Sequence, residues 1–535
     1  MKSDSDTWIS RTAVTLKENA TVYHVITKVL NEKNYNYESV NNSYISSITN
    51  PSGTTLAEFT KGNNSGWLYK VNGELPNLGL KDYNLSDGDS IVLYYSADWT
   101  KDPDAGDIAD NSSSGGNTGG TIGNVSTKDN VVISTIIKAT TDKNGNAQVS
   151  VQEKDIIAAI EDIVKEENKE LQKELQIEVQ TDSKATSVET TLQKAVIAEL
   201  NKKIDVLTIK TSLANISLDY QTLAGFIKDT AGDVKVTASK VNIGENEKIS
   251  EEAKIELKKE IGDRPVFDFT ILAGNKKVSN FKGQISVLIP YIPAENENPN
   301  SIIIYYINDS GKLEIVKNCI YDVKTKTIKF VTNHFSNYVV GCKEVSFDDI
   351  KAHWAKDNIV FLGSREIIKG KTKKVFDPNS NITRAEFVQI LANMSNADLS
   401  KYSVSSFGDV KAEAWYAKAV LWAEKTGVVY GTERADGSIV FRPNDNISRQ
   451  DMAVIISRYM KNIEEKELKV TAKEIKFTDQ DKFENYANTA VTELQKAGII
   501  NGLKNRDGSI NFYSANNATR AESATMIVNI IQKNL

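Results

Sequence analysis

The last third of the chain, residues 345–535, repeats one pattern of landmarks three times, and this repetition limits the folds open to it. Each copy has an aspartate, then an aromatic residue, a glycine and a Thr/Ser-Arg pair. The aromatic residue and the glycine are 16 positions apart in every copy. The landmarks are Asp349, Trp354, Gly370 and Thr383-Arg384 in the first copy, Asp409, Trp415, Gly431 and Ser448-Arg449 in the second, and Asp479, Tyr486, Gly502 and Thr519-Arg520 in the third.

The apolar spacing around these landmarks predicts two short helices per copy, with the glycine closing the first helix and a hairpin-like loop before the second. We place the copies at residues 345–403, 404–470 and 471–535. A unit of about 60 residues with two short helices cannot bury both of its faces. The three copies are therefore expected to pack on one another.

The Thr/Ser-Arg pairs stand where the second helix of each copy should begin. Thr383 with Glu386 and Thr519 with Glu522 have the spacing of a capping box, and Ser448 with Asp451 is a weaker form of it. We expect these six residues to cap helices.

Helix capping does not explain the arginine that follows each capping residue. A cation in the first turn opposes the helix dipole, at a cost of about 0.3–1 kcal/mol. Three of the chain's ten arginines nevertheless occupy this position. A guanidinium fork suits a carboxylate or phosphate, so ligand binding is one role. A bridge to a carboxylate of a neighbouring copy, such as the Asp349 class, is the other, and the two roles are compatible.

The aromatic landmarks Trp354, Trp415 and Tyr486 also have two interpretations. They either anchor the core of each copy or present a flat apolar wall to a sugar ring. Trp422 lies within a helix and is expected in the core.

The rest of the chain divides at residues 104–127, a Gly/Ser/Asn-rich segment that predicts a flexible linker. Residues 1–103 read as a small α+β domain, with a helix over 21–30, strands over 67–71 and 91–95, and turns at Asn72-Gly73 and Asp87-Gly88. Trp67 and Tyr69 are core or ligand-stacking aromatics. Residues 128–344 read as a β-rich α+β spacer of one or two subdomains, with helices over 153–165, 192–203 and 220–228.

The predicted fold class is therefore multidomain α+β with a C-terminal part dominated by helices. A net charge of −6 argues against nucleic acid as the main partner. No apolar run approaches the ~18 residues of a membrane span, and no signal peptide is visible. Cys319 and Cys342 could form a disulfide or remain buried thiols. With three histidines and two cysteines, we predict no metal, no cofactor and no catalytic residues, although enzymatic activity in residues 128–344 stays open.

Residues 345–535 resemble three tandem S-layer homology modules. The resemblance implies a pseudo-threefold unit that binds secondary cell wall polysaccharide on peptidoglycan, often bearing ketal-pyruvate, in grooves between modules. It implies that Arg384, Arg449 and Arg520 meet the glycan carboxylate and that Asp349, Asp409 and Asp479 are hydrogen-bonding groups of the grooves. Trp354, Trp415 and the third-copy Tyr486 would pack against sugar, and Gly370, Gly431 and Gly502 would let the backbone approach it closely.

Two departures from the module pattern affect this expectation. The second copy has Ser448-Arg449-Gln450-Asp451 in place of Thr-Arg-Ala-Glu, and the third has Tyr486 in place of tryptophan. We therefore give more weight to the grooves of Arg384 and Arg449 than to that of Arg520.

The segment Gly66 to Tyr95, with its Gly-Trp, Val-Asn-Gly and Asp-Gly-Asp landmarks, resembles a domain of unknown function that is similar to the C-terminal β-domain of transcobalamin. The resemblance implies a binding module whose ligand is unknown, with a corrinoid as a lesser alternative. The end of the middle region is loosely similar to the β-rich spacers of Gram-positive surface proteins.

The expected protein is a non-enzymatic, secreted surface protein of a Gram-positive bacterium, anchored to wall glycan through its C-terminal third. Its signal peptide would have been removed. The alternatives are a glycan-cleaving enzyme anchored in the same way and a lattice-forming S-layer subunit.

Overall fold

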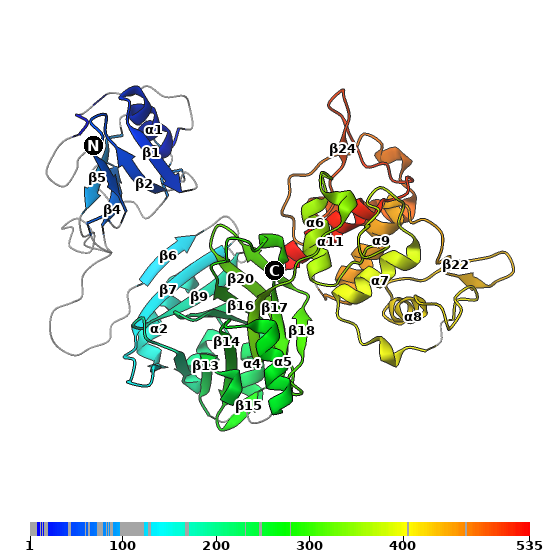
Figure 1. Ribbon diagram of the computed structural model, residues 1–535, viewed down its shortest axis with the longest axis horizontal. Helices are drawn as coiled ribbons and strands as arrows, with labels where there is room; N and C mark the ends of the chain where they lie inside the picture. The colour runs from blue at the N-terminus through cyan, green and yellow to red at the C-terminus, as the bar shows by residue number, and fades with distance from the viewer. Residues whose placement is uncertain are drawn as a thin grey trace. The chain divides into compact units, whose positions relative to one another are not determined.

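The chain forms two compact units, Met1–Asn117 and Thr118–Leu535, seen in a computed structural model (Figure 1). Each unit is described by itself. The described residues are 8–10, 12, 14, 20–40, 44–58, 60–61, 65–71, 79–81, 83, 85, 89–96, 122–126, 130–165, 171–229, 232–245, 249–278, 280–403, 406–465 and 468–534.

The N-terminal unit packs one helix with two small sheets, ordered β1-β2-β3 and β4-β5. Its core contains Trp67, whose indole Nε1 donates a hydrogen bond to the Leu56 carbonyl at 2.8 Å, and the buried Tyr69. The predicted helix and strands are present, and both aromatics are core residues. The turns predicted at Asn72-Gly73 and Asp87-Gly88 lie outside the described residues. The elements are α1 (Val22–Glu32), β1 (Asn36–Val40), β2 (Tyr44–Thr49), β3 (Thr55–Ala57), β4 (Gly66–Val71) and β5 (Ile91–Ser96).

The middle region contains two sheets. The first has the order β19-β20-β16-β12-β11-β9-β7-β6, and the second has the order β18-β17-β21-β14-β13-β10-β8 with β15 paired to β14. The strands are β6 (Ile122–Ser126), β7 (Asn130–Lys138), β8 (Asn146–Val151), β9 (Gln172–Gln180), β10 (Ser187–Leu192), β11 (Val206–Lys210), β12 (Asn215–Asp219), β13 (Val234–Val241), β14 (Val266–Ala273), β15 (Lys276–Val278), β16 (Asn280–Pro290), β17 (Ile302–Ile307), β18 (Leu313–Val316), β19 (Cys319–Asp322), β20 (Thr327–His334) and β21 (Asn337–Cys342).

One hydrophobic cluster runs through both sheets and helices α2 (Glu153–Lys165), α3 (Lys194–Leu200) and α4 (Tyr220–Asp229). Both sheets therefore share one main core, and a smaller cluster beneath helix α5 (Glu251–Ile261), which includes Leu257, Ile261 and Val339, lies apart from it. Strand β6 pairs with β7 and lies inside the segment expected to be linker, so the sheet extends into the end of that segment. Cys319 and Cys342 are free thiols.

Helix α5 (Glu251–Ile261) was not anticipated from the sequence. Its signals are nonetheless present: Ser250 accepts a hydrogen bond from the Ala253 N–H, and Gly262 follows the helix with a φ of 61°. Only two of its residues are buried, Leu257 and Ile261, so its apolar periodicity is weak.

The C-terminal repeats each contribute two helices, and the helices pack between repeats (Figure 1). Helix α7 packs on α8, α9 on α10, and α11 returns to α6, so the contacts close a ring. The elements are α6 (Lys356–Ser364), α7 (Arg384–Met394), α8 (Ala417–Lys425), α9 (Arg449–Asn462), α10 (Asn485–Lys496) and α11 (Arg520–Asn534), with hairpins β22 (Thr432–Glu433) to β23 (Ile439–Val440) and β24 (Leu503–Lys504) to β25 (Ile510–Asn511).

Three backbone hydrogen bonds close the same ring at its centre. The Ile382 N–H donates to the Ala518 carbonyl at 3.0 Å, the Ile447 N–H to Ile382 at 3.0 Å and the Ala518 N–H to Ile447 at 2.9 Å. Each residue lies just before the N-cap of a second helix. The three second helices therefore begin around one point.

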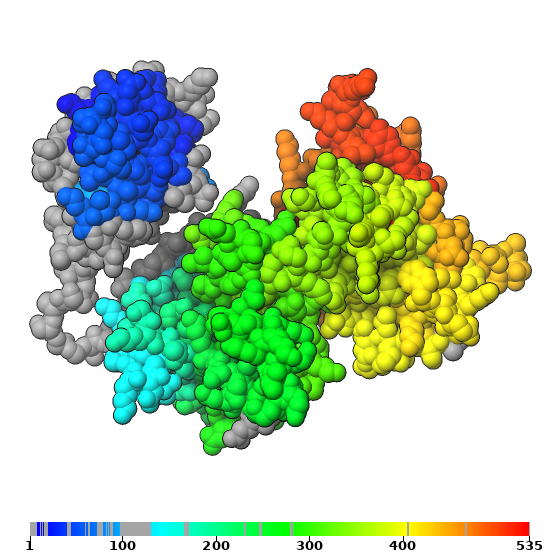
Figure 2. Space-filling view, viewed as in Figure 1, coloured from blue at the N-terminus to red at the C-terminus, as the bar shows by residue number. Residues whose placement is uncertain are grey.

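The middle region and the first repeat are joined through Arg365, which is fully buried. Its guanidinium donates to the backbone carbonyls of Cys319 and Ile302 in the middle region. Figure 2 shows these two parts in contact, with the green end of the cyan-to-green middle region against the yellow-green first repeat. In the part of the chain that the structure describes, no helix combines the length and apolarity needed to cross a membrane.

Candidate functional site

The aspartate of each repeat organises its own repeat. The Asp349 carboxylate accepts hydrogen bonds from the backbone N–H groups of Phe376 and Asp377, at 2.9 and 2.6 Å. Burial tends to raise the pKa of Asp349, but the two backbone donors outweigh it and the pKa is lowered. Asp409 accepts in the same way from residues 441 and 442, and Asp479 from residues 512 and 513. These carboxylates hold the loop that precedes the second helix.

The three repeat arginines point across the boundary into the next repeat. Nε of Arg384 donates to the Phe441 carbonyl at 2.9 Å, Nε of Arg449 to Phe512 at 2.8 Å, and Nε of Arg520 to Phe376 at 3.1 Å. All three arginines are at least nine-tenths buried. The last contact joins the third repeat to the first, so the arginines form a second closed ring.

Each arginine faces the carboxylate of the next repeat's capping box, which is the acidic residue three positions after the Thr or Ser. Nη1 of Arg449 lies 2.5 Å from Glu522, and Nη1 of Arg520 lies 3.1 Å from Glu386. The equivalent distance from Arg384 to Asp451 is 3.7 Å. A bridge between repeats thus exists, but its carboxylate is the capping acid and not the Asp349 class.

Glu386 and Glu522 each cap the start of a helix and also pair with an arginine of another repeat. One carboxylate oxygen of Glu386 accepts from the Thr383 N–H at 2.9 Å, while the other accepts from Arg520. Glu522 does the same for Thr519 and Arg449. In the second repeat Ser448 accepts from the Asp451 N–H at 3.1 Å. The shorter Asp451 side chain makes no return bond among the described contacts, so this box is half formed.

The glycine landmarks are explained by packing inside each repeat. A Cβ on Gly370 would collide with the ring of Phe347, on Gly431 with Phe407, and on Gly502 with Phe477. Gly370 also lies six residues beyond Ser364, where α6 ends, so the prediction that it closes the first helix is wrong. Close packing inside the repeat therefore accounts for these glycines, whatever else approaches them.

The aromatic landmarks are exposed. Trp354, Trp415 and Tyr486 are 65%, 63% and 57% exposed, whereas Trp422 is buried in the core as predicted. The core interpretation of the three landmarks is therefore wrong. Flat apolar side chains held on the surface of each repeat are available for stacking.

A pocket of about 360 Å³ opens beside Arg384. Its wall includes residues from three repeats: Arg384 from the first, Gly431 and Asp451 from the second, and Tyr486 from the third. The Tyr486 hydroxyl donates to Asp451 at 2.7 Å. Tyr486 was expected to weaken the groove of Arg520, but the structure places it in the pocket of Arg384. Sequence reasoning also missed Arg442 and Arg458, which line this pocket. Arginine is much rarer than lysine in this chain, and that rarity could have singled them out.

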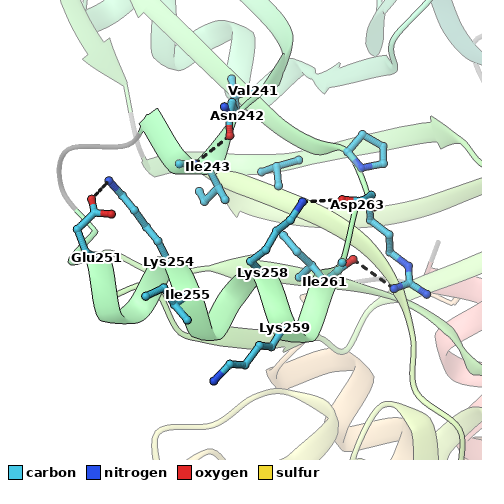
Figure 3. Close-up of a pocket in the computed structure, with 15 residues that line it drawn as sticks. Val241, Asn242, Ile243, Glu251, Lys254, Ile255, Lys258, Lys259, Ile261 and Asp263 are labelled. Atoms are coloured by element: carbon cyan, nitrogen blue, oxygen red, sulfur yellow. Dashed lines mark hydrogen bonds and ion pairs between the residues drawn. The ribbon is translucent and has the colours of Figure 1, made fainter.

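A larger cavity of about 620 Å³ lies in the middle region against α5 (Figure 3). Its cations are paired: Lys254 with Glu251 at 2.7 Å and Lys258 with Asp263 at 2.6 Å. None of the predicted site residues lines this cavity. Among the described residues, no group of three or more His, Cys, Asp or Glu side chains could hold a metal ion.

Comparison with known families finds a match in the N-terminal unit and in the first two repeats. The S-layer homology domain matches residues 346–388 and 406–453. The chain carries S-layer homology domains. A domain of unknown function, DUF4430, matches residues 19–97, and this is the transcobalamin-like family. With these S-layer homology domains the protein is a cell-surface protein.

The third repeat lies outside the ranges matched by the S-layer homology domain. Asp479, Gly502 and Arg520 nevertheless make the same contacts as their counterparts in the first two repeats.

Curated relatives are similar to parts of the chain. The chain is 33% identical to an amylopullulanase of Thermoanaerobacterium thermosulfurigenes over 55% of its length and 15% of the relative. It is 37% identical to the exoglucanase XynX of Acetivibrio thermocellus over 36% of its length and 17% of that protein. It is 34% identical to the S-layer protein sap of Bacillus anthracis over 21% of its length and 13% of that protein. The chain thus spans less than a fifth of each.

Proposed function

We propose that the three repeats form a pseudo-threefold anchor that binds secondary cell wall polysaccharide in grooves between repeats. The carrying observation is the closed ring, which places a buried guanidinium at each repeat boundary, together with the exposed Tyr486 that lines the pocket of Arg384. A buried cation beside a surface ring suits an acidic sugar, whose charged group meets the guanidinium while its apolar face stacks. The relatives named as S-layer proteins support this function.

In this proposal the middle region is a non-enzymatic spacer, and the N-terminal unit is a ligand-binding domain displayed on the cell surface. The buried contacts of Arg365 support the spacer, because they join the middle region to the anchor. The relatives named as glycosidases are matched over less than a fifth of their length, so their activity does not pass to this chain by similarity.

Co-sedimentation of the full chain with purified sacculi tests the anchor. We expect pelleting with intact sacculi and none with sacculi stripped of secondary polysaccharide. Replacing Trp354, Trp415 and Tyr486 together by alanine should abolish pelleting without unfolding, because all three side chains are exposed. Tyr220→Ala, which removes a 52% exposed tyrosine of the middle region, is the matched control. Equal pelleting with stripped sacculi would contradict the proposal.

A further inference from the structure

Four departures from the repeat pattern meet at the pocket beside Arg384. When the repeats are aligned on their Thr/Ser-Arg pairs, Asp451 takes the place of a glutamate. In the order of landmarks, Tyr486 takes the place of the tryptophans of the other two repeats. Arg442 and Arg458 also stand alone: their counterparts are Asp377 and Asn393 in the first repeat, and Tyr513 and Asn529 in the third. All four of these side chains line the one pocket.

The first two departures leave Arg384 without a close carboxylate. Glutamates 522 and 386 reach their arginines at 2.5 and 3.1 Å, while Asp451 stays 3.7 Å from Arg384. Aspartate is one methylene shorter, and the Tyr486 hydroxyl holds its other oxygen. A tryptophan at that position has no hydroxyl. Arg384 is 8% exposed and lines the pocket, and its described contacts are a hydrogen bond to the Phe441 carbonyl and the long ion pair with Asp451. Its guanidinium has five donors, so it keeps donors for a ligand.

The other two departures add positive charge. Arg458 lies over the ring of Tyr430, 4.5 Å from its centroid, and that contact orients it at the pocket wall. Its counterparts Asn393 and Asn529 instead donate to the carbonyls of Ile367 and Ile499, which is a structural task. Arg442, whose nearest described carboxylate is Asp445 at 3.8 Å, is the third guanidinium. The lining holds three arginines and one aspartate, and with Asp445 beside Arg442 the pocket and its rim carry one net positive charge.

The other two grooves are closed by their own ion pairs. Arg449 is engaged by Glu522 and the Phe512 carbonyl. Arg520 is engaged by Glu386, the Phe376 carbonyl and, through Nη2, the Lys369 carbonyl at 2.8 Å. Of the other cations near Arg520, Lys371 is paired with Asp377 at 2.6 Å. A ligand anion would have to displace a glutamate from either arginine, which costs the buried pair.

We propose that the Arg384 pocket is the anion-receiving groove of this chain, and that Asp451, Arg442 and Arg458 determine this choice. The inference rests on the proposed wall-binding function and deepens it. The occupant is a sugar residue that carries an acidic group, either a carboxylate or a phosphate ester, because three guanidinium forks suit either group. The pocket volume of about 360 Å³ falls within the ~300–1,000 Å³ usual for small-molecule sites. Arg449 and Arg520 hold the ring together.

The test uses the full chain and isolated secondary wall polysaccharide in calorimetric titration. Arg458→Asn installs the residue of the other two repeats, and we expect affinity to fall about tenfold through loss of one charge-assisted contact. Asp451→Glu should pair with Arg384, fill the pocket and weaken binding by a similar factor. Arg434→Asn, an exposed arginine outside the pocket in the same repeat, is the charge-matched control and should change nothing. Thermal unfolding verifies that all variants fold.

Two treated polysaccharides identify the acid. Carboxyl reduction should abolish binding if the group is a carboxylate, and removal of phosphate esters should abolish it if it is a phosphate. Unchanged binding after both treatments overturns the inference. So does wild-type affinity of both Arg458→Asn and Asp451→Glu while the protein still pellets with sacculi. Failure of the wild-type chain to pellet with any sacculi would instead overturn the proposed function, so the two failures are distinguishable.

Discussion

At the scale of single residues, a carboxylate that accepts backbone hydrogen bonds contributes stability that depends on pH. Asp349 holds the N–H groups of Phe376 and Asp377, and its pKa in the folded chain is lowered. A carboxyl whose folded pKa lies below its unfolded value stabilises the fold above the unfolded pKa of ~3.9 and loses that contribution as pH falls through the folded value.

Asp349→Asn should therefore lower the melting temperature at pH 7. Between about pH 5 and pH 3, the melting temperature of this variant should fall by less than that of the wild-type chain. Melting curves across that range provide the measurement. Asp348→Asn removes the neighbouring exposed aspartate, whose described partner is Lys351, and is the matched control. A parallel loss of melting temperature in wild type and Asp349→Asn would contradict this reading of the hydrogen bonds.

The Cys342 thiol is protected in the folded chain. Burial, with help from a hydrogen bond to Glu344, raises the pKa of Cys342 to about 12. At pH 8 the thiolate, which is the reactive form, is then roughly one part in ten thousand. We expect a thiol-specific reagent to label Cys342 far more slowly in the native chain than in urea. Rapid native labelling, or a Cys319–Cys342 disulfide detected by mass without reduction, would refute this.

At the scale of elements, each repeat folds its loop against its own first segment around a glycine. A Cβ on Gly370 would collide with the ring of Phe347 and would lie 2.5 Å from the Thr372 carbonyl oxygen, where backbone cannot yield cheaply. We expect Gly370→Ala to destabilise the repeats by about 1–3 kcal/mol, as overpacking does. Gly408→Ala is the control, because nothing lies near that position. Chemical denaturation measures both, and equal stability would remove the packing argument.

The apolar periodicity of the sequence predicted the helices that bury one face in the core. It missed the helix that buries little of its surface. Helices α2 and α4 were found because their apolar residues face the core, whereas α5 buries little and was missed. The bridge between repeats was expected, but the Asp349 class was given as its example, because sequence spacing does not show which carboxylate of the next repeat faces each arginine. For the same reason Tyr486 was placed in the wrong groove. Ring closure is a property of three copies, and no single copy encodes it.

At the scale of the whole molecule, Arg365 couples the unfolding of the middle region to the unfolding of the three repeats. Its fully buried guanidinium donates to the carbonyls of Asn300, Ile302 and Cys319 at 3.1, 3.0 and 2.9 Å, and to Phe361 of its own repeat at 3.0 Å. It also lies over the Phe361 ring at 3.5 Å. A buried cation satisfied by carbonyls of two domains makes their separation costly, because separation breaks several charge-assisted bonds together.

We therefore expect the middle region and the three repeats to unfold in one calorimetric transition, distinct from that of the N-terminal unit. Arg365→Met keeps most of the side-chain volume but leaves buried carbonyl oxygens without donors, at a cost on the order of 3 kcal/mol. The single transition should then split into two, with the repeats and the middle region melting apart. Arg434→Met, on the exposed turn of the second-repeat hairpin, should leave it unsplit. Two transitions already present in the wild-type chain, or none gained in Arg365→Met, would mean that the spacer and the anchor are mechanically independent and that Arg365 serves the first repeat alone.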